Sequence, residues 1–175
     1  MNLPNALSLV RIFLVPVLVV FLVPRPDELT AAAVFLAAVL TDWLDGRIAR
    51  RTRQVTTLGK LLDPVADKLL IAASLISLVQ VHRVPAWVVV VIVGRDIAVT
   101  GLRAIAAAQN VIIPASDFGK LTMTAEVIAV VFLILSWPPM LVPLGNAVLL
   151  VAAAISVTSG ALYFRQFWRC VDLEK

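Results

Sequence analysis

Residues 127–164 read VIAVVFLILSWPPMLVPLGNAVLLVAAAISVTSGALYF and contain no charged side chain. A membrane-spanning helix needs about 20 mostly apolar residues, so this stretch has room for two of them. Prolines at 138–139 and at 143 lie between its two halves. Proline is unfavourable inside a helix, because it lacks an N–H and clashes with the preceding turn. The stretch therefore predicts two spanning helices, near 119–137 and 144–166, joined by a turn that holds these prolines.

The composition of the whole chain points the same way. Of 175 residues, 61% are hydrophobic and 15% are charged, and the mean hydropathy is +1.00. A soluble domain of this size cannot bury so much apolar surface. A single Cys excludes a disulfide framework, and a single His excludes a multi-histidine metal site. The net charge of +4 comes from basic residues scattered among apolar runs, so we expect no nucleic-acid partner.

Upstream, the charge-free segments are shorter, for example 12–24 and 84–94, and each span must continue into charged residues at one end. The pattern predicts about six helices, at residues 5–24, 29–51, 60–81, 85–108, 119–137 and 144–166. We therefore expect an all-α integral membrane protein, a bundle of six transmembrane helices in a single domain over 1–175. With an even number of spans, both termini lie on one side.

The basic residues give this bundle an orientation. Only Arg25 and Arg83 fall at the end opposite the termini. The other thirteen lie toward the termini: Arg11, Arg47, Arg50, Arg51, Arg53, Lys60, Lys68, Arg95, Arg103, Lys120, Arg165, Arg169 and Lys175. The positive-inside rule then predicts that both termini are cytoplasmic.

Two predicted helices carry an unusual set of carboxylates near that end. Residues 42–50 read DWLDGRIAR, and residues 59–68 read GKLLDPVADK. Asp42 and Asp45 are three residues apart, and Asp63 and Asp67 are four apart, so each pair shares a helix face. A short connection makes the two helices antiparallel neighbours, and the four carboxylates converge.

Four converging carboxylates repel one another unless cations neutralise them. Oxygen ligands favour Mg²⁺ or Mn²⁺. In a phosphoryl transfer, a pair of such ions stabilises both the oxygen that attacks the phosphorus and the oxygen that leaves it. Gly46 and Ala49 leave room beside this face for a bulky ligand, and Arg50 lies one turn further on. The alternative is a structural one, in which the aspartates form salt bridges with Arg50, Lys60 and Lys68.

The spacing D-x2-D-G-x2-A-R-x8-G-x3-D-x3-D over residues 42–67 resembles the signature of the CDP-alcohol phosphatidyltransferase family at every fixed position. The resemblance implies transfer of a phosphatidyl or similar group from a CDP-linked lipid to an alcohol, with release of CMP. It also implies a homodimer of six-helix bundles whose active site opens to the cytoplasm, in a bacterial-type inner membrane.

The resemblance also implies roles for single residues. Asp42, Asp45, Asp63 and Asp67 correspond to ligands of a two-metal site. Asp67 corresponds as well to the base that accepts the proton of the acceptor hydroxyl. Residues matching those that hold the CDP-lipid are Gly46, Ala49, Arg50, Thr56, Asn5 and Ser8. Helix capping by Asn5 is the alternative for the last pair.

Residues 2–12, 62–68 and 94–103 resemble one branch of the family, the bacterial phosphatidylglycerophosphate synthases. That branch implies CDP-diacylglycerol as donor and glycerol 3-phosphate as acceptor, among membrane lipids. An acceptor phosphate suits three cations, Arg95, Arg103 and Lys120. The alternative is a structural one, in which Arg95 pairs with Asp96 or a site aspartate and Lys120 pairs with Asp117. The resemblance ends near residue 130, and the last helix is expected to contribute only hydrophobicity.

Two positions depart from that branch. Thr122 stands where a second Lys is common, and Glu126 stands where a Gln is common. An acidic group weakens anion binding, so two other acceptors stay open: phosphatidylglycerol, which gives cardiolipin, and an inositol phosphate. A divalent-cation channel or transporter is the alternative from another class. It predicts charges through the membrane midplane and at both ends, and the charge-poor outer halves argue against it.

Overall fold

The chain folds into helices, and the described part contains no strand. The computed structural model describes residues 3–24, 26–52, 57–108 and 117–172, with the side chains of 3–5, 43–52, 57–64, 108, 117–118, 166 and 169–172 left out. Its helices are α1 Leu3–Leu22, α2 Glu28–Thr52, α3 Thr57–Gln80, α4 Ala86–Ala108, α5 Asp117–Ile134 and α6 Leu141–Asp172. Each coincides with a predicted helix, which confirms the all-helical prediction.

The proline turn is confirmed in part. Helix α5 ends at Ile134 and α6 begins at Leu141, so Pro138 and Pro139 lie between them. Pro143, which we expected to lie in the turn as well, is instead the third residue of α6. Proline is tolerated there, because the first N–H groups of a helix have no partner inside the helix.

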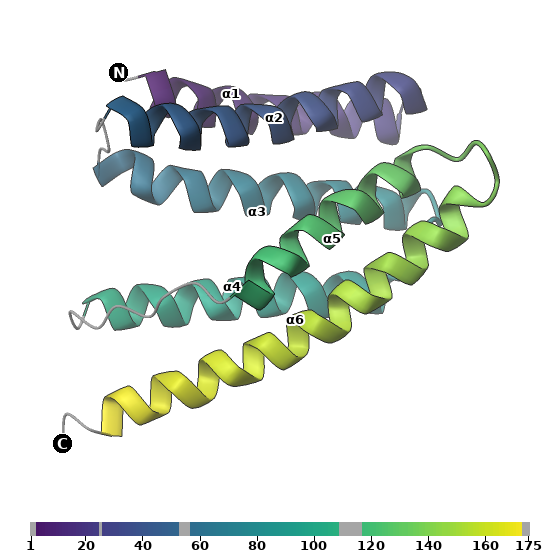
Figure 1. The fold of residues 1–175 in the computed structure, drawn as a ribbon. Helices are drawn as coiled ribbons and strands as arrows, with labels where there is room; N and C mark the ends of the chain where they lie inside the picture. The colour runs from purple at the N-terminus through teal and green to yellow at the C-terminus, as the bar shows by residue number, and fades with distance from the viewer. Residues whose placement is uncertain (1–2, 25, 53–56, 109–116, 173–175) are drawn as a thin grey trace.

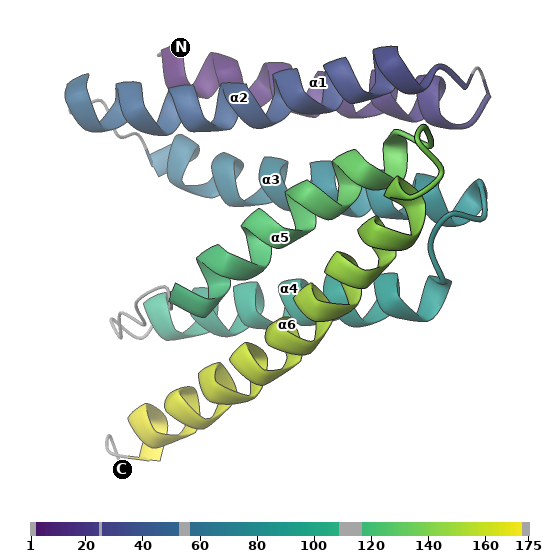
Figure 2. The ribbon, with the colours of Figure 1, turned by 45° about the vertical axis from the view of Figure 1, so that its right-hand side comes forward.

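The helices form two groups that meet along α3 (Figures 1 and 2). Helix α1 packs against α2 and α3, while α6 packs against α4 and α5. Helix α5 crosses the bundle obliquely and also contacts α2 and α3. The two ends of the chain lie at the same end of the bundle. The short α1–α2, α3–α4 and α5–α6 connections lie at the opposite end.

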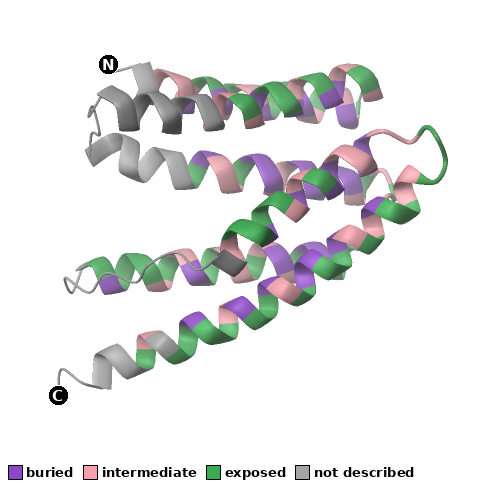
Figure 3. Cartoon of the chain, in the orientation of Figure 1, coloured by how far each residue is buried: buried purple, intermediate pink, exposed green. Residues whose placement is uncertain are grey.

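A core of apolar side chains joins the two groups. Phe35, Leu75, Ile92, Leu133 and Leu149 are almost completely buried in one cluster. Many large apolar side chains nevertheless face outward, as the exposed positions along every helix show (Figure 3). Val90 and Phe13 are each 70% exposed. So large an apolar exterior is unusual for a soluble protein and fits a lipid-facing surface.

In the described part of the chain, the segment Leu141–Arg165 is long and apolar enough by itself to cross a membrane, and Ala6–Leu22 is a shorter apolar helix. The other helices carry charged residues within their length. This agrees with the expectation that the inner halves of the spans are charged. The six-span arrangement belongs to the proposal below.

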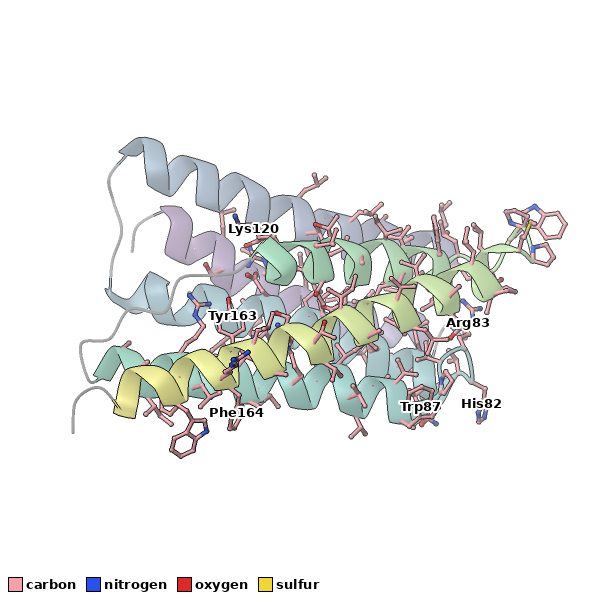
Figure 4. All side chains as sticks on the ribbon, turned by 60° about the horizontal axis from the view of Figure 1, so that its bottom comes forward. His82, Arg83, Trp87, Lys120, Tyr163 and Phe164 are labelled. Atoms are coloured by element: carbon pink, nitrogen blue, oxygen red, sulfur yellow. The ribbon has the colours of Figure 1, made fainter. Side chains whose placement is uncertain are left out.

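The end of the bundle away from the termini is closed by a polar cluster around Arg83 (Figure 4). One guanidinium nitrogen of Arg83 donates to the carbonyl oxygens of Leu133 and Ile134, at 3.0 and 2.6 Å, and the other pairs with Glu28. The second oxygen of Glu28 accepts from the backbone N–H of Ser136 at 2.7 Å. Arg83 therefore caps the C-terminus of α5 and ties it to the start of α2.

Just before Glu28, Asp27 caps the N-terminus of α2. Its carboxylate accepts from the Thr30 backbone N–H at 3.1 Å and from the Thr30 hydroxyl at 2.7 Å. These hydrogen bonds, led by that from the hydroxyl, hold the pKa of Asp27 below its usual value. The α1–α2 turn is therefore fixed at both its acidic residues.

Candidate functional site

A buried arginine on α1 joins the two aspartate motifs. Nη1 of Arg11 lies 3.1 Å from Asp42 Oδ1 on α2, and it also donates to Asp67 Oδ1 on α3. Nε of Arg11 donates to the carbonyl oxygen of Ala38 at 3.3 Å, and the Arg11 side chain is fully buried. Because one nitrogen contacts both carboxylates, Asp42 and Asp67 converge as predicted. Sequence reasoning placed Arg11 at the cytoplasmic end but missed this role.

The backbone also supports the spacing argument. Asp42 and Asp45 both lie on the continuous helix α2, and Asp63 and Asp67 both lie on α3. The side chains of several predicted site residues fall outside the described part: Asn5, Asp45, Gly46, Ala49, Arg50 and Asp63, with Thr56 outside it altogether. Ser8 is described and is fully buried on α1.

The carboxylates that are described suit a hard metal ion. Asp42 and Asp67 remain 32% and 24% exposed and offer only oxygen donors, as Mg²⁺ and Mn²⁺ prefer. Among the described side chains no group of three or more potential ligands is found. Asp45 and Asp63, which would complete the predicted set, lie outside those side chains. The donor chemistry of Asp42 and Asp67 therefore fits the expected metal.

A cavity of about 340 Å³ opens beside Asp67 between α3, α4, α5 and α6. Its lining includes seven charged side chains: Asp67, Lys68, Arg95, Asp96, Arg103, Lys120 and Glu126. The three cations predicted to bind an acceptor phosphate are thus on one cavity with the predicted base. Arg103 and Lys120 are exposed. Lys120, on α5, and Tyr163, on α6, are both in view in Figure 4, away from the end that holds His82 and Trp87.

Arg95 is held firmly by α6. Its Nε donates to the carbonyl oxygen of Ser156 at 3.1 Å, and its Nη2 donates to the Ser159 hydroxyl at 2.8 Å. A Cβ added at Gly160 would lie 3.1 Å from Arg95 Cγ, so the glycine lets the arginine pack closely. The expectation that the last helix contributes only hydrophobicity is therefore wrong. The signal was the spacing of small and polar residues, Ser156, Ser159 and Gly160, in an otherwise apolar helix.

The structural alternative for Arg95 is also present, since its Nη1 donates to Asp96 Oδ1 at 2.8 Å. Lys68 likewise has structural partners, because its Nζ donates to the carbonyl oxygen of Asp96 at 2.6 Å and to the Thr100 hydroxyl. Lys68 therefore braces α3 against α4. Of the three predicted phosphate-binding cations, Arg103 and Lys120 are the more accessible.

The two positions that depart from the synthase pattern also line the cavity. Thr122 is 2% exposed and Glu126 is 3% exposed. Glu126 faces the charges of Asp96, Arg95 and Lys68. The acidic group is therefore inside the expected acceptor pocket and not on the outer surface of α5.

Comparison with known proteins gives the same assignment as the motif. Residues 1–158 match the CDP-alcohol phosphatidyltransferase family. The chain belongs to this family. The CDP-alcohol phosphatidyltransferase match runs from the start of α1 well into α6, beyond the point near residue 130 where the motif resemblance ended.

Several relatives are similar over nearly the whole chain. A CDP-diacylglycerol--glycerol-3-phosphate 3-phosphatidyltransferase of Bacillus subtilis is 40% identical, covering 97% of each chain. A protein of the same name from Pseudomonas fluorescens is 37% identical over 96% of this chain and 91% of its own. A CMP-forming cardiolipin synthase of Oryza sativa is 35% identical over 97% of this chain and 58% of its own. Relatives similar to this chain are therefore named for more than one reaction.

Proposed function

We propose that this protein transfers the phosphatidyl group of CDP-diacylglycerol to glycerol 3-phosphate in phospholipid biosynthesis, giving phosphatidylglycerophosphate and CMP. The observation that carries the proposal is the single cavity that connects Asp67 with Arg103 and Lys120. It puts a carboxylate that can accept a proton beside cations that can bind an acceptor phosphate. The relatives named for this reaction, at 40% and 37% identity, support the same choice.

In this mechanism Asp67 is the base. The terminal hydroxyl of glycerol 3-phosphate gives its proton to Asp67 as its oxygen attacks the lipid-side phosphorus in line. The bond from that phosphorus to the CMP oxygen breaks, and CMP leaves with the electron pair. Arg11 holds Asp67 in place, since it is buried and contacts both Asp67 and Asp42.

Asp42, Asp45, Asp63 and Asp67 would hold the divalent ions, Mg²⁺ or Mn²⁺. Such ions supply positive charge to the phosphate oxygens and acidify a nearby hydroxyl. Gly46, Ala49, Arg50 and Thr56 would hold the CDP group, and Asn5 and Ser8 the lipid head group. Arg103 and Lys120 would bind the acceptor phosphate by charge-assisted hydrogen bonds, with Arg95 fixed beside them by α6.

We also propose that the six helices span a bacterial-type inner membrane with the termini and the site on the cytoplasmic side, as a homodimer. The outward apolar side chains support the membrane placement. The excess of basic residues toward the termini supports the orientation. Dimerisation rests on the family resemblance.

A second acceptor, phosphatidylglycerol, is the other candidate, and the rice cardiolipin synthase is the observation that favours it.

The test measures CMP release by the purified protein in detergent with CDP-diacylglycerol and Mg²⁺. The acceptors compared are glycerol 3-phosphate, phosphatidylglycerol, inositol phosphate and serine. We expect turnover with glycerol 3-phosphate that is abolished in Asp67→Asn. Turnover with phosphatidylglycerol alone would support the cardiolipin reaction, and folded protein that releases no CMP with any acceptor would refute the reaction class.

A further inference from the structure

Glu126 is a buried carboxylate that has no role in the proposed reaction. It lies on α5, is 3% exposed and lines the cavity beside Asp67. Its Oε1 has no hydrogen-bond partner among the described residues. A buried carboxylate oxygen without a partner is costly, and such atoms in native proteins usually have a ligand or water as their partner.

Two cations and one carboxylate surround Glu126 in the cavity. Arg95 and Lys68 attract its negative charge, while its burial and Asp96 oppose it. Both cations already donate to other groups, Arg95 to Ser156, Ser159 and Asp96, and Lys68 to Asp96 and Thr100. The free oxygen of Glu126 therefore remains available to a donor that enters the cavity.

A small phosphorylated alcohol has such a donor at the right place. Arg103, Lys120 and Glu126 line the same cavity as Asp67. An acceptor whose phosphate is bound by Arg103 and Lys120 therefore has its carbon chain in the cavity that Glu126 lines. Its terminal hydroxyl is needed at Asp67 for attack, so its central hydroxyl is the group left to contact α5.

We propose that Glu126 accepts a hydrogen bond from the central hydroxyl of the acceptor and so selects a glycerol phosphate over phosphorylated alcohols that lack this group. The inference rests on the proposed function and deepens it. It also gives a reason for the departure at this position: a side chain that disfavours the phosphate is retained because it binds the hydroxyl.

The test compares glycerol 3-phosphate with 3-hydroxypropyl phosphate, which has the phosphate and the attacking hydroxyl but lacks the central one. The quantity measured is the ratio of kcat/KM for the two acceptors, from CMP release. We expect a ratio of about ten or more in the wild type, because the analogue leaves the buried oxygen without a partner. In Glu126→Ala the ratio falls to about one.

Three further variants make the result decisive. Glu126→Met keeps the length of the side chain in case Glu126→Ala does not fold, and it too is expected to give a ratio near one. Glu126→Gln keeps an acceptor oxygen and is expected to keep most of the discrimination. Ser74→Ala is the control, since the Ser74 side chain is also fully buried, but its hydroxyl donates to the Leu70 carbonyl oxygen within α3 and it does not line the cavity; its ratio should equal that of the wild type.

A wild-type ratio near one, or a ratio that stays high in Glu126→Ala and Glu126→Met, overturns the inference and indicates that water satisfies Glu126. In both cases turnover of glycerol 3-phosphate leaves the proposed reaction intact. Wild-type protein that releases no CMP from glycerol 3-phosphate overturns the reaction and the inference together.

Discussion

Replacing Arg11 with methionine removes a side chain that contacts both aspartate motifs, at Asp42 and at Asp67. The guanidinium is fully buried and contacts Asp42, Asp67 and the Ala38 carbonyl oxygen. Removing one partner of a fully buried ion pair costs about 3–5 kcal/mol. Since the two carboxylates are 32% and 24% exposed, solvent screening reduces this to about 2–4 kcal/mol.

The assay is thermal unfolding in detergent, first with EDTA and then with Mg²⁺. In EDTA we expect the Tm of Arg11→Met to fall by roughly 5–15 °C. Added Mg²⁺ is expected to raise the Tm of the variant more than that of the wild type, because two carboxylates have lost their cation. A ligand at about 100 times its Kd adds about 2.7 kcal/mol, which is enough to offset most of the loss.

Two controls bracket this result. Arg165→Met makes the same chemical change at an exposed position on α6 and should change the stability by less than about 0.5 kcal/mol. Arg11→Lys should be intermediate, since a single ammonium does not reproduce the planar fork of arginine. A Tm of Arg11→Met equal to that of the wild type in EDTA, or an equal response of both to Mg²⁺, would refute the reasoning.

Three other predictions follow from the same contacts. Gly160→Val should raise the KM for glycerol 3-phosphate by about ten-fold with a smaller change in kcat, since its side chain displaces Arg95; steady-state CMP release checks this, and an unchanged KM would contradict it. Arg83→Met should lower the free energy of unfolding by about 1–2 kcal/mol, because Glu28 and the last carbonyl groups of α5 lose their donor. The kcat/KM of Arg83→Met should match that of the wild type at temperatures below its unfolding transition, since the cavity lies away from Arg83. A large loss of activity would contradict the view that the Arg83 cluster and the cavity act independently. EDTA should abolish CMP release, and Mg²⁺ or Mn²⁺ should restore it, whereas full activity in EDTA would remove the metal from the mechanism.

The sequence predicted the helices well because their determinants are local. Hydropathy and the positions of Pro138 and Pro139 are properties of neighbouring residues. The helix boundaries follow from them closely except at the end of α6, which continues to Asp172, beyond the predicted end at 166. Pro143 was placed wrongly because the neighbouring sequence does not distinguish a proline in the loop before a helix from a proline in its first turn. Proline is favourable at either position.

The candidate site was predicted only in part. The aspartate motifs and the three cations were found from charge and spacing, and the structure gathers Asp67, Arg95, Arg103 and Lys120 on one cavity. The contribution of Ser159 and Gly160 was missed, because a small residue in an apolar helix usually reflects helix packing. Only the position of Arg95, 64 residues away from Ser159 in the sequence, gives these residues a role.

By itself, the sequence determined the all-helical class of fold, the family and the spacing of the carboxylates, because each depends on short stretches of composition or spacing. The tertiary structure alone decided that Arg11 joins Asp42 to Asp67 and that α6 orients Arg95. It also decided that Glu126 is buried in the cavity with one oxygen that has no partner among the described residues. The physical reason is that these contacts join helices far apart in sequence, as Arg11 and Asp67 are by 56 residues. Which side chains meet there depends on how the helices cross and rotate against one another, and that is fixed by packing of the whole bundle.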